Sequence, residues 1–356
     1  MPHIKTELSC TIQPETCIIR EEKVISICRS NEMEENGITF ADYIVNRVCP
    51  DNRFLEEMNR VIPWWELQEW FSVHVKRNHN RPGRPAYPII LMFKIHLLQQ
   101  WYNLSDRQAE FQINDRLSFR KFLGLGIEDL IPDATTIENF RHDILEHQNI
   151  GKGLIKVLDK YFQEIGLIKR EGNLVDATFL QANSKCHTNR NKNSDKDARA
   201  GYKGFGYSGT INMDKKSKLI RNVFVTPANI LDFKSLAPVL LGDEKEIYAD
   251  RGYAPCRKSL SERFPNKKLE IMFKRHRGKQ GAPTPELSDK EKELNVNCAK
   301  IRARVEHAFG VMKSKFGVNR IMYRTLERAG VKFESLAIAY NFYRLGFLMR
   351  TRDNCA

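Results

Sequence analysis

Residues 300–315 read KIRARVEHAFGVMKSK, and this stretch decides how the rest of the chain is interpreted. Its apolar residues recur at i, i+3, i+4, i+7 and i+11, the spacing of a helix that packs one face against a larger core. The residues at these positions are Val305, Ala308, Phe309, Met312 and Phe316. The pattern therefore predicts a partly buried helix over this range.

Charged residues lie beside that apolar stripe. Arg302, Glu306 and Lys313 are four and seven residues apart, so on one helix they project from nearly the same side. Glu306 is the only acidic residue between Leu294 and Leu326, in a span rich in lysine and arginine. A lone carboxylate in a basic field suggests an anionic polymer held beside a metal ion. The alternative is that Glu306 pairs with Arg302 one helical turn earlier.

The charge of the chain is unevenly distributed. Its 356 residues carry a formal charge of +14, yet the first sixty residues hold seven basic and eleven acidic side chains, which leaves +18 on the remainder. A surplus of this size on a folded chain favours a nucleic-acid partner, because each neutralised phosphate releases counterions.

The sequence contains no run of about 18 apolar residues, and its start lacks the basic and apolar regions of a signal peptide. We expect a soluble, cytoplasmic and nucleoid-associated protein with no membrane partner. The eight cysteines include no Cys-x-x-Cys pair, so we expect reduced, scattered thiols. A zinc site built from the first four cysteines and a nearby histidine stays open as an alternative.

The first part of the chain reads as an acidic lead over residues 1–60 followed by helices over residues 61–150. Helical periodicity is strongest over residues 86–101. Two capping boxes open further helices, one formed by Ser105 with Gln108 and one by Thr135 with Glu138. Short helices between tight turns favour an all-helical DNA-binding domain, and a purely structural helical bundle is the alternative.

Several side chains in this region are candidate DNA contacts. A basic, proline-bearing arm over residues 76–85 centres on Arg84, similar to the arms that enter a minor groove; a solvated linker is the alternative. In a helix-turn-helix-like reader, Thr136, Asn139 and Arg141 would face the major groove.

After residue 150 the pattern changes to short apolar strands. Strands are predicted at 174–178, 206–213, 219–226, 246–250 and 269–273, and helices at 150–166, 232–241, 255–263 and 331–349. This order predicts an α/β domain over residues 151–350 with a mixed sheet flanked by helices. The basic stretch from Lys185 to Lys203 reads as a loop that positions backbone phosphates.

Three carboxylates in this domain are candidate metal ligands. Asp176 and Asp250 each end a predicted apolar strand, and Glu306 lies on the helix expected to pack against those strands. Three oxygen ligands suit Mg²⁺ or Mn²⁺, which share the rest of their coordination sphere with water and phosphate. Two such ions activate an attacking oxygen and stabilise a leaving oxygen, so the predicted chemistry is phosphoryl transfer. An Asp176 turn cap and an Asp250 contact to Arg251 are the structural alternatives.

The blocks that contain these acids resemble the three signature blocks of bacterial insertion-sequence DDE transposases, and they are most similar to the insertion sequence five group. They are VDAT at 175–178, YADRGY at 248–253 and RARVEHAFGVMK at 302–313. The group's N-terminal region is resembled by RP at 84–85, LLQQWYNLSD at 97–106, DRLSFR at 115–120 and PDATTI at 132–137. The match runs in order from about residue 62 to about residue 349.

The resemblance implies a ribonuclease-H-like catalytic domain in which Asp176, Asp250 and Glu306 form the catalytic triad and hold two Mg²⁺ or Mn²⁺ ions. It also implies that Arg302 and Lys313, which match an R-x3-E-x6-K spacing, hold DNA near the scissile phosphate. Residues 1–50 are not covered by the resemblance.

Two positions depart from the pattern. Ala299 stands where the wider signature has tyrosine, which puts a tyrosine contact to DNA in doubt. Leu231 precedes Asp232 where this branch often has histidine, a change that leaves the triad untouched.

The sequence thus predicts a transposase that binds the terminal inverted repeats of its element through residues 61–150 and then cleaves and transfers DNA strands. Asp176 would bridge both ions, and synapsis of two ends favours a homodimer or a larger complex. A DNA-binding regulator that descends from such an enzyme without cutting is the main alternative. A metal-dependent nuclease without strand transfer is the other.

Overall fold

The computed structural model describes residues 52–76, 85–183, 195–274, 286–317 and 320–353, which belong to one compact unit. Residues 1–51, which are most of the predicted acidic lead and hold its four cysteines, lie outside these residues, as do Arg84 and Lys185. The last part of the predicted lead is described and is helical from Arg53. Within the described part of the chain, no helix has the length and apolar character needed to cross a bilayer. The two thiols in this part, Cys256 and Cys298, are free.

Seven strands in the described residues form one sheet, whose main order is β4-β3-β1-β5-β6. The bounds are β1 Asn173–Ala182, β2 Arg199–Gly201, β3 Gly204–Asp214, β4 Ile220–Pro227, β5 Glu246–Ala249, β6 Lys268–Ile271 and β7 Arg320–Ile321. β3 pairs antiparallel with β1 and β4, whereas β5 runs parallel to β1 and β6. Three antiparallel strands followed by two parallel ones form the ribonuclease-H-like arrangement, so the predicted fold class is confirmed.

The pairing of β1 with β5 positions the acidic residues. Both strands carry buried apolar runs, as expected for central strands covered on two faces. The register places Val175 opposite Ala249, so Asp176 and Asp250 follow at neighbouring positions. β5 ends at Ala249, and β7 joins the same edge of β1 only at Gln181. Asp176 therefore lies on a stretch of that edge where the described residues provide no paired strand.

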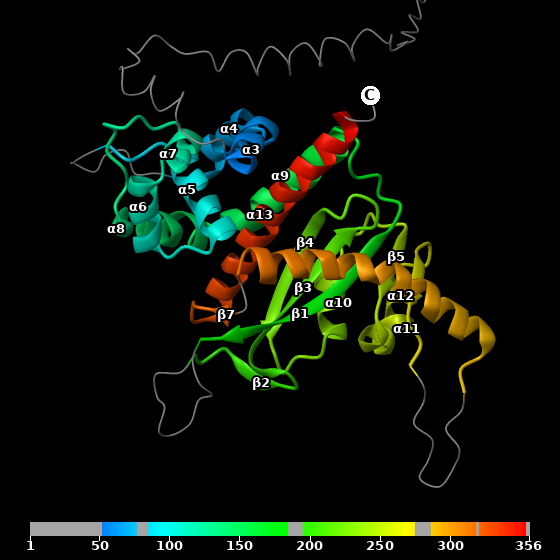
Figure 1. Ribbon diagram of the computed structural model, residues 1–356. Coiled ribbons are helices and arrows are strands. Elements are labelled where there is room, and N and C mark those ends of the chain that lie inside the picture. The colour runs from blue at the N-terminus through cyan, green and yellow to red at the C-terminus, as the bar shows by residue number, and fades with distance from the viewer. Residues whose placement is uncertain (1–51, 77–84, 184–194, 275–285, 318–319, 354–356) are drawn as a thin grey trace, which may run out of the picture. The chain divides into compact units, whose positions relative to one another are not determined.

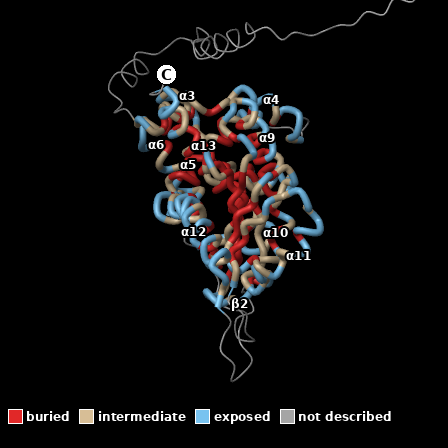
Figure 2. Tube along the Cα trace, turned by 90° about the vertical axis from the view of Figure 1, so that its right-hand side faces the viewer, coloured by how far each residue is buried: buried red, intermediate tan, exposed pale blue. Residues whose placement is uncertain are grey.

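Helices cover both faces of the sheet (Figure 1). On one face lie α9 (Ile150–Glu164), α12 (Asp289–Gly310) and α13 (Leu326–Asp353), which share a core with β1, β3 and β4. On the other lie α10 (Phe233–Val239), the 3-10 segment η2 (Arg251–Cys256) and α11 (Arg257–Arg263) around a second, smaller core. Figure 2 shows the buried residues running through the middle of the unit between these layers. α12 crosses β1 and β5 close to the aspartates.

The region before the sheet is helical, as predicted. Its elements are α3 Arg53–Val61, α4 Trp64–His74, α5 Ile89–Tyr102, α6 Asp106–Asp115, α7 Leu117–Leu123, α8 Ala134–Phe140 and the π-helical segment η1 Arg141–Glu146. α5 is almost entirely buried, and Trp101 donates a hydrogen bond from Nε1 to the Ala339 carbonyl in α13 at 3.0 Å. Because α13 also packs on β4, the helical region and the sheet share one core.

One of the two predicted capping boxes is confirmed. Both hydrogen bonds of the box formed by Ser105 and Gln108 are present at the start of α6. The box predicted at Thr135 is wrong, because α8 starts at Ala134 and is capped by Asp133, whose carboxylate accepts a bond from the Thr136 amide. Aspartate is at least as good an N-cap as threonine, so the earlier residue takes the position.

The helix predicted over residues 300–315 differs at both ends. α12 begins at Asp289 and stops at Gly310, after which the chain continues as the π-helical segment η3 (Val311–Lys315). A π turn holds more residues than an α turn, so it rotates the side chains that follow it. Lys313 is therefore out of the line that a continuous α-helix would give it with Arg302 and Glu306.

The loop predicted up to Lys203 is interrupted by a short strand, while residues 195–198 and 202–203 form no helix or strand. Arg199–Gly201 forms β2 on the edge of β3. Asp195 is buried and accepts a hydrogen bond from the Tyr207 hydroxyl. This internal partner explains why the chain before β2 is held against the sheet, although its composition is polar and basic.

A buried arginine connects β4 to α9 and to the segment before β5. Arg221 is fully buried and donates from Nε to Asp159 Oδ1 at 2.7 Å and from Nη2 to Asp243 Oδ2 at 2.8 Å. Burying charged groups is costly, and here the opposite charges of Arg221, Asp159 and Asp243 offset that cost only while all three side chains are present.

We predict that Arg221→Ala lowers the free energy of unfolding by about 3 kcal/mol or more, because Asp159 and Asp243 lose their shared counter-charge. Denaturant titration followed by circular dichroism measures this change. Arg170→Ala is the matched control, since Arg170 pairs with Asp243 from a half-exposed position and should cost under about 1 kcal/mol. Equal losses in the two variants would contradict the prediction.

Candidate active site

Asp176 and Asp250 meet beside α12. The apolar run predicts Asp176 at the end of a strand. In the structure Asp176 lies within β1, because this strand continues to Ala182. Asp250 directly follows β5. Asp176 Oδ2 is 2.7 Å from Arg302 Nη2, and Asp250 Oδ2 is 4.0 Å from the same nitrogen. Two of the three predicted acids therefore converge on one guanidinium.

Backbone amides orient the other oxygen of each carboxylate. The Ala177 amide donates to Asp176 Oδ1 at 2.9 Å, and the Gly252 amide donates to Asp250 Oδ1 at 2.7 Å. Burial raises the pKa of Asp176, and the Arg302 charge and the amide oppose this only in part. Each aspartate thus has one oxygen fixed by the backbone and one that faces α12.

Arg302 is the residue that the two aspartates share. Its side chain is 21 % exposed, and its Nε has no hydrogen-bond partner among the described residues. It bonds to Asp176 and not to Glu306, so the helix-surface pair considered from the sequence is not formed. The guanidinium predicted to hold a DNA phosphate is held here by carboxylates.

Glu306 lies apart from the two aspartates. It is exposed, one turn after Arg302 on α12, which is roughly 6 Å further along the helix axis. Across the described ranges, no group of three or more His, Cys, Asp or Glu side chains is placed to hold a metal ion. The predicted cage of three carboxylates is therefore not assembled in this structure.

Two residues near the aspartates had no role in the sequence interpretation. Tyr253 in η2 is buried, and its pKa is raised well above the usual value by burial and then by the charges of Asp176, Asp232 and Asp250. Asp232 lines the same cavity as Ala177, the residue that follows Asp176, so it also belongs to the surroundings of the site. Tyr253 ends the block YADRGY, and this position was the signal that could have identified it.

The DNA contacts predicted on α8 and at the start of η1 differ in how accessible they are. Asn139 is exposed and Thr136 is partly exposed, so both are accessible. Arg141 pairs with Asp106 at 2.5 Å and lies over the Tyr323 ring. Its charge is thus compensated within the protein, and a groove contact by Arg141 would require this pair to open.

Lys203 and Lys313 gather beside β1. Lys203 is exposed on the turn between β2 and β3, and Lys313 is half-buried next to Thr178. Lys203 and Lys313 each line a hollow that Thr178 also lines, so both lie beside this residue. Burial lowers the pKa of Lys313, and the positive charge of Lys203 lowers it further. Two cations thus flank the strand just beyond Asp176.

The surroundings of Asp176 and Asp250 fit a divalent cation in part. The Arg302 guanidinium lies within 4.0 Å of both carboxylates, so it marks a position where the protein stabilises positive charge. Mg²⁺ is commonly held by one or two carboxylates together with water and phosphate oxygens. Asp176 and Asp250 would supply those carboxylates, and Glu306 would join them after a side-chain or helix movement.

Two family models match this chain. Residues 43–143 match a model described as a transposase domain (DUF772), and residues 168–342 match a model described as a transposase DDE domain. The second range contains Asp176, Asp250 and Glu306 and the whole of the sheet. The chain contains a transposase DDE domain.

One solved structure shows a weak overall likeness to the chain. The chain is similar to the piggyBac transposase in its synaptic complex with hairpin DNA, at 9 % sequence identity and a TM-score of 0.42. The similarity covers 90 % of this chain and 78 % of that one. A likeness of this degree says nothing about the substrate of this DDE domain.

We predict that Arg302→Gln tightens Mn²⁺ binding to the full-length, DNA-free protein by about tenfold, because the guanidinium no longer competes for the aspartates. Isothermal titration calorimetry measures the affinity. Arg304→Gln is the matched control, since Arg304 lies on the same helix and bonds to the Lys215 carbonyl, outside the aspartate pair. The same Mn²⁺ affinity in the wild type and in Arg302→Gln would contradict competition at this position.

Proposed function

We propose that the chain is a DNA transposase of the insertion sequence five group that cleaves the ends of its own element and joins them to target DNA. One observation carries this proposal: Asp176 and Asp250 converge on Arg302 of α12. The two aspartates follow Val175 and Ala249, which lie opposite each other on two parallel strands. Carboxylates arranged in this way inside a DDE domain suit metal-dependent phosphoryl transfer.

Asp176 and Asp250 would hold Mg²⁺ or Mn²⁺, with Glu306 completing the site. When bound, the metal supplies the positive charge that activates a water and stabilises the leaving oxygen. The amides of Ala177 and Gly252 fix the angle at which each carboxylate faces α12, so the ligands are oriented before substrate arrives. Such prior orientation is what a metal site needs from its surroundings.

The step that readies this site would involve Arg302. A DNA phosphate near the aspartates is an anion, like the Asp176 carboxylate, and can accept two parallel hydrogen bonds from the Arg302 guanidinium. Arg302 would then leave Asp176 for the phosphate, and the freed carboxylate would be available to the metal. Lys203 and Lys313 would hold the neighbouring backbone without reading its sequence.

End recognition would belong to residues 61–150, and the chemistry to residues 151–350. Thr136 and Asn139 are accessible on α8 and would contact bases, while the arm around Arg84 would reach the adjacent groove. Because two element ends must be held together before joining, we propose that a homodimer or larger assembly acts on double-stranded DNA.

A second candidate is a regulator that binds DNA without cutting it. The observation that favours it is the Arg302–Asp176 ion pair together with the separate position of Glu306, which leaves the described residues without a three-carboxylate group. The two candidates differ in whether DNA opens that pair, and strand cleavage distinguishes them.

We predict that Asp176→Asn lowers Mg²⁺-dependent nicking of end-bearing DNA on the order of a thousandfold, because the loss of a metal ligand removes several kcal/mol of charge stabilisation in the transition state. The substrate is the DNA that flanks the coding sequence on both sides, and nicked and joined products are separated on denaturing gels. DNA affinity should be unchanged.

Asp289→Asn is the control, because its carboxylate is fully exposed at the start of α12 and far along the helix from Arg302. It should cut at the normal rate. Normal cutting by Asp176→Asn would refute the assigned chemistry, and binding without cutting in the wild type would favour the regulator.

A further inference from the structure

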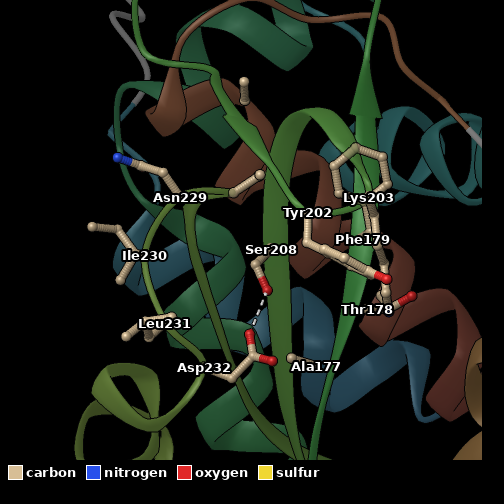
Figure 3. Close-up of a pocket in the computed structure, with 13 residues that line it drawn as sticks. Ala177, Thr178, Phe179, Tyr202, Lys203, Ser208, Asn229, Ile230, Leu231 and Asp232 are labelled. Carbon is tan, nitrogen blue, oxygen red and sulfur yellow. Dashed lines mark hydrogen bonds between the residues drawn. The ribbon is translucent and has the colours of Figure 1, made fainter. Parts of the chain in front are cut away.

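A cavity of about 450 Å³ opens beside β1 immediately after the catalytic Asp176 (Figure 3). Three parts of the chain line it: β1 from Ala177 to Phe179, the turn between β2 and β3, and the loop between β4 and α10. Its size is that of a pocket for one small organic ligand. The position matters because a ligand held there would lie next to the phosphate that Asp176 is proposed to act on.

Two aromatic side chains lie at one end of this cavity, toward the right in Figure 3. Tyr202, on the turn between β2 and β3, is fully exposed, with no burial of its ring. The Phe179 ring on β1 lies against that same turn, because a Cβ on Gly204 would be 3.4 Å from its Cζ. An unburied tyrosine ring at the mouth of a cavity is a surface on which a flat molecule can stack.

Positive charge surrounds the same end of the cavity. Lys203 follows Tyr202 in the turn and lines the cavity, while Lys313 lines an adjoining gap on the other side of Thr178. Both lysines therefore lie beside Thr178, and two cations near one point are stabilised by an anion between them. The charge therefore favours a phosphate near Thr178.

Polar groups lie at the opposite end. The Ser208 hydroxyl donates to Asp232 Oδ1 at 3.2 Å, and Asp232 is exposed, so its carboxylate can also accept from a ligand. The Asn229 side chain is exposed on the same loop and can both donate and accept. The cavity thus combines a stacking surface, hydrogen-bonding groups for a polar edge, and cations for a phosphate.

We infer that this cavity binds a single unpaired nucleotide of the DNA substrate, with its base against Tyr202 and Phe179 and its phosphate between Lys203 and Lys313. A nucleotide has the three parts that the cavity provides for, namely a flat base, a polar base edge and an anionic backbone. The inference rests on the proposed function, because it assumes that DNA lies across Asp176.

The test measures how strongly a single-stranded tail contributes to DNA binding. A short mixed-sequence duplex is compared with the same duplex carrying an unpaired 3′ tail, by fluorescence anisotropy in EDTA so that no cleavage occurs. For the wild type, the tail should tighten binding about tenfold, the gain expected from stacking one base on an aromatic ring. Tyr202→Ala should lose this gain, and Tyr202→Phe should keep it because the ring face remains.

Phe347→Ala is the control, because Phe347 is a partly exposed aromatic residue of α13 that does not line the cavity. It should keep the full gain. Circular dichroism checks that each variant is folded, and Tyr202 is exposed enough that its removal should leave the fold intact. A tail carrying 5-iodouracil at the first unpaired position should crosslink to Tyr202 or Phe179 under ultraviolet light.

The outcomes separate this inference from the proposed function. If the blunt duplex binds but the tail adds nothing, or if Tyr202→Ala keeps the gain, the nucleotide pocket is refuted and the transposase proposal stands. A crosslink that maps to another part of the chain refutes the pocket in the same way. If neither DNA binds, both proposals fail.

Discussion

The site depends on keeping two like charges side by side. Like charges repel at short range, so Asp176 and Asp250, which both approach one nitrogen of Arg302, would move apart if only their side chains held them. The parallel pairing of β1 with β5 prevents this, because it fixes the two backbones in register up to Val175 and Ala249. Arg302 supplies the compensating charge from α12. The strand pairing thus holds the two carboxylates near each other, and the positive charge of Arg302 offsets their repulsion.

This constraint also explains the position of the open edge. β1 continues beyond Asp176, while β5 ends before Asp250. Before Asp176, β1 is paired with both β3 and β5, whereas at Asp176 the described residues pair it with β3 alone. A substrate can approach β1 along that edge, between α12 on one side and the turn after β2 on the other. The lysines that flank this approach, Lys203 and Lys313, come from segments more than a hundred residues apart.

Much of the fold could be predicted from local sequence. The apolar runs before Asp176 and Asp250 indicated strands, and the box at Ser105 marked the start of a helix, because each of these signals lies within a few residues. The resemblance of whole blocks to transposases then placed the strands in a known order. These features are set by residues close together in the chain, so they can be recognised from the sequence.

Features that depend on distant partners could not be predicted. Arg302 and Asp176 are separated by 126 positions, and nothing near either residue indicates that they bond to each other instead of to DNA or metal. Arg141 pairs with Asp106, 35 positions away, for the same reason. The π turn of η3 was missed because its sequence keeps helical periodicity. The strand β2 was missed because its three residues, RAG, are too few to show an alternating pattern and follow a polar, basic stretch.

The shared core of α13 has a consequence for how such proteins can be recombined. The Trp101 bond to Ala339 anchors the helical region to a helix that also covers the sheet, so the part proposed to read DNA and the part proposed to cut it are built on one element. A chimera that grafts the N-terminal helices onto another catalytic sheet would expose the face of α5 unless it brought a compatible C-terminal helix as well. Recognition of a new DNA end should therefore evolve by substitutions on α8 within an intact chain, and not by exchanging the N-terminal helices between proteins.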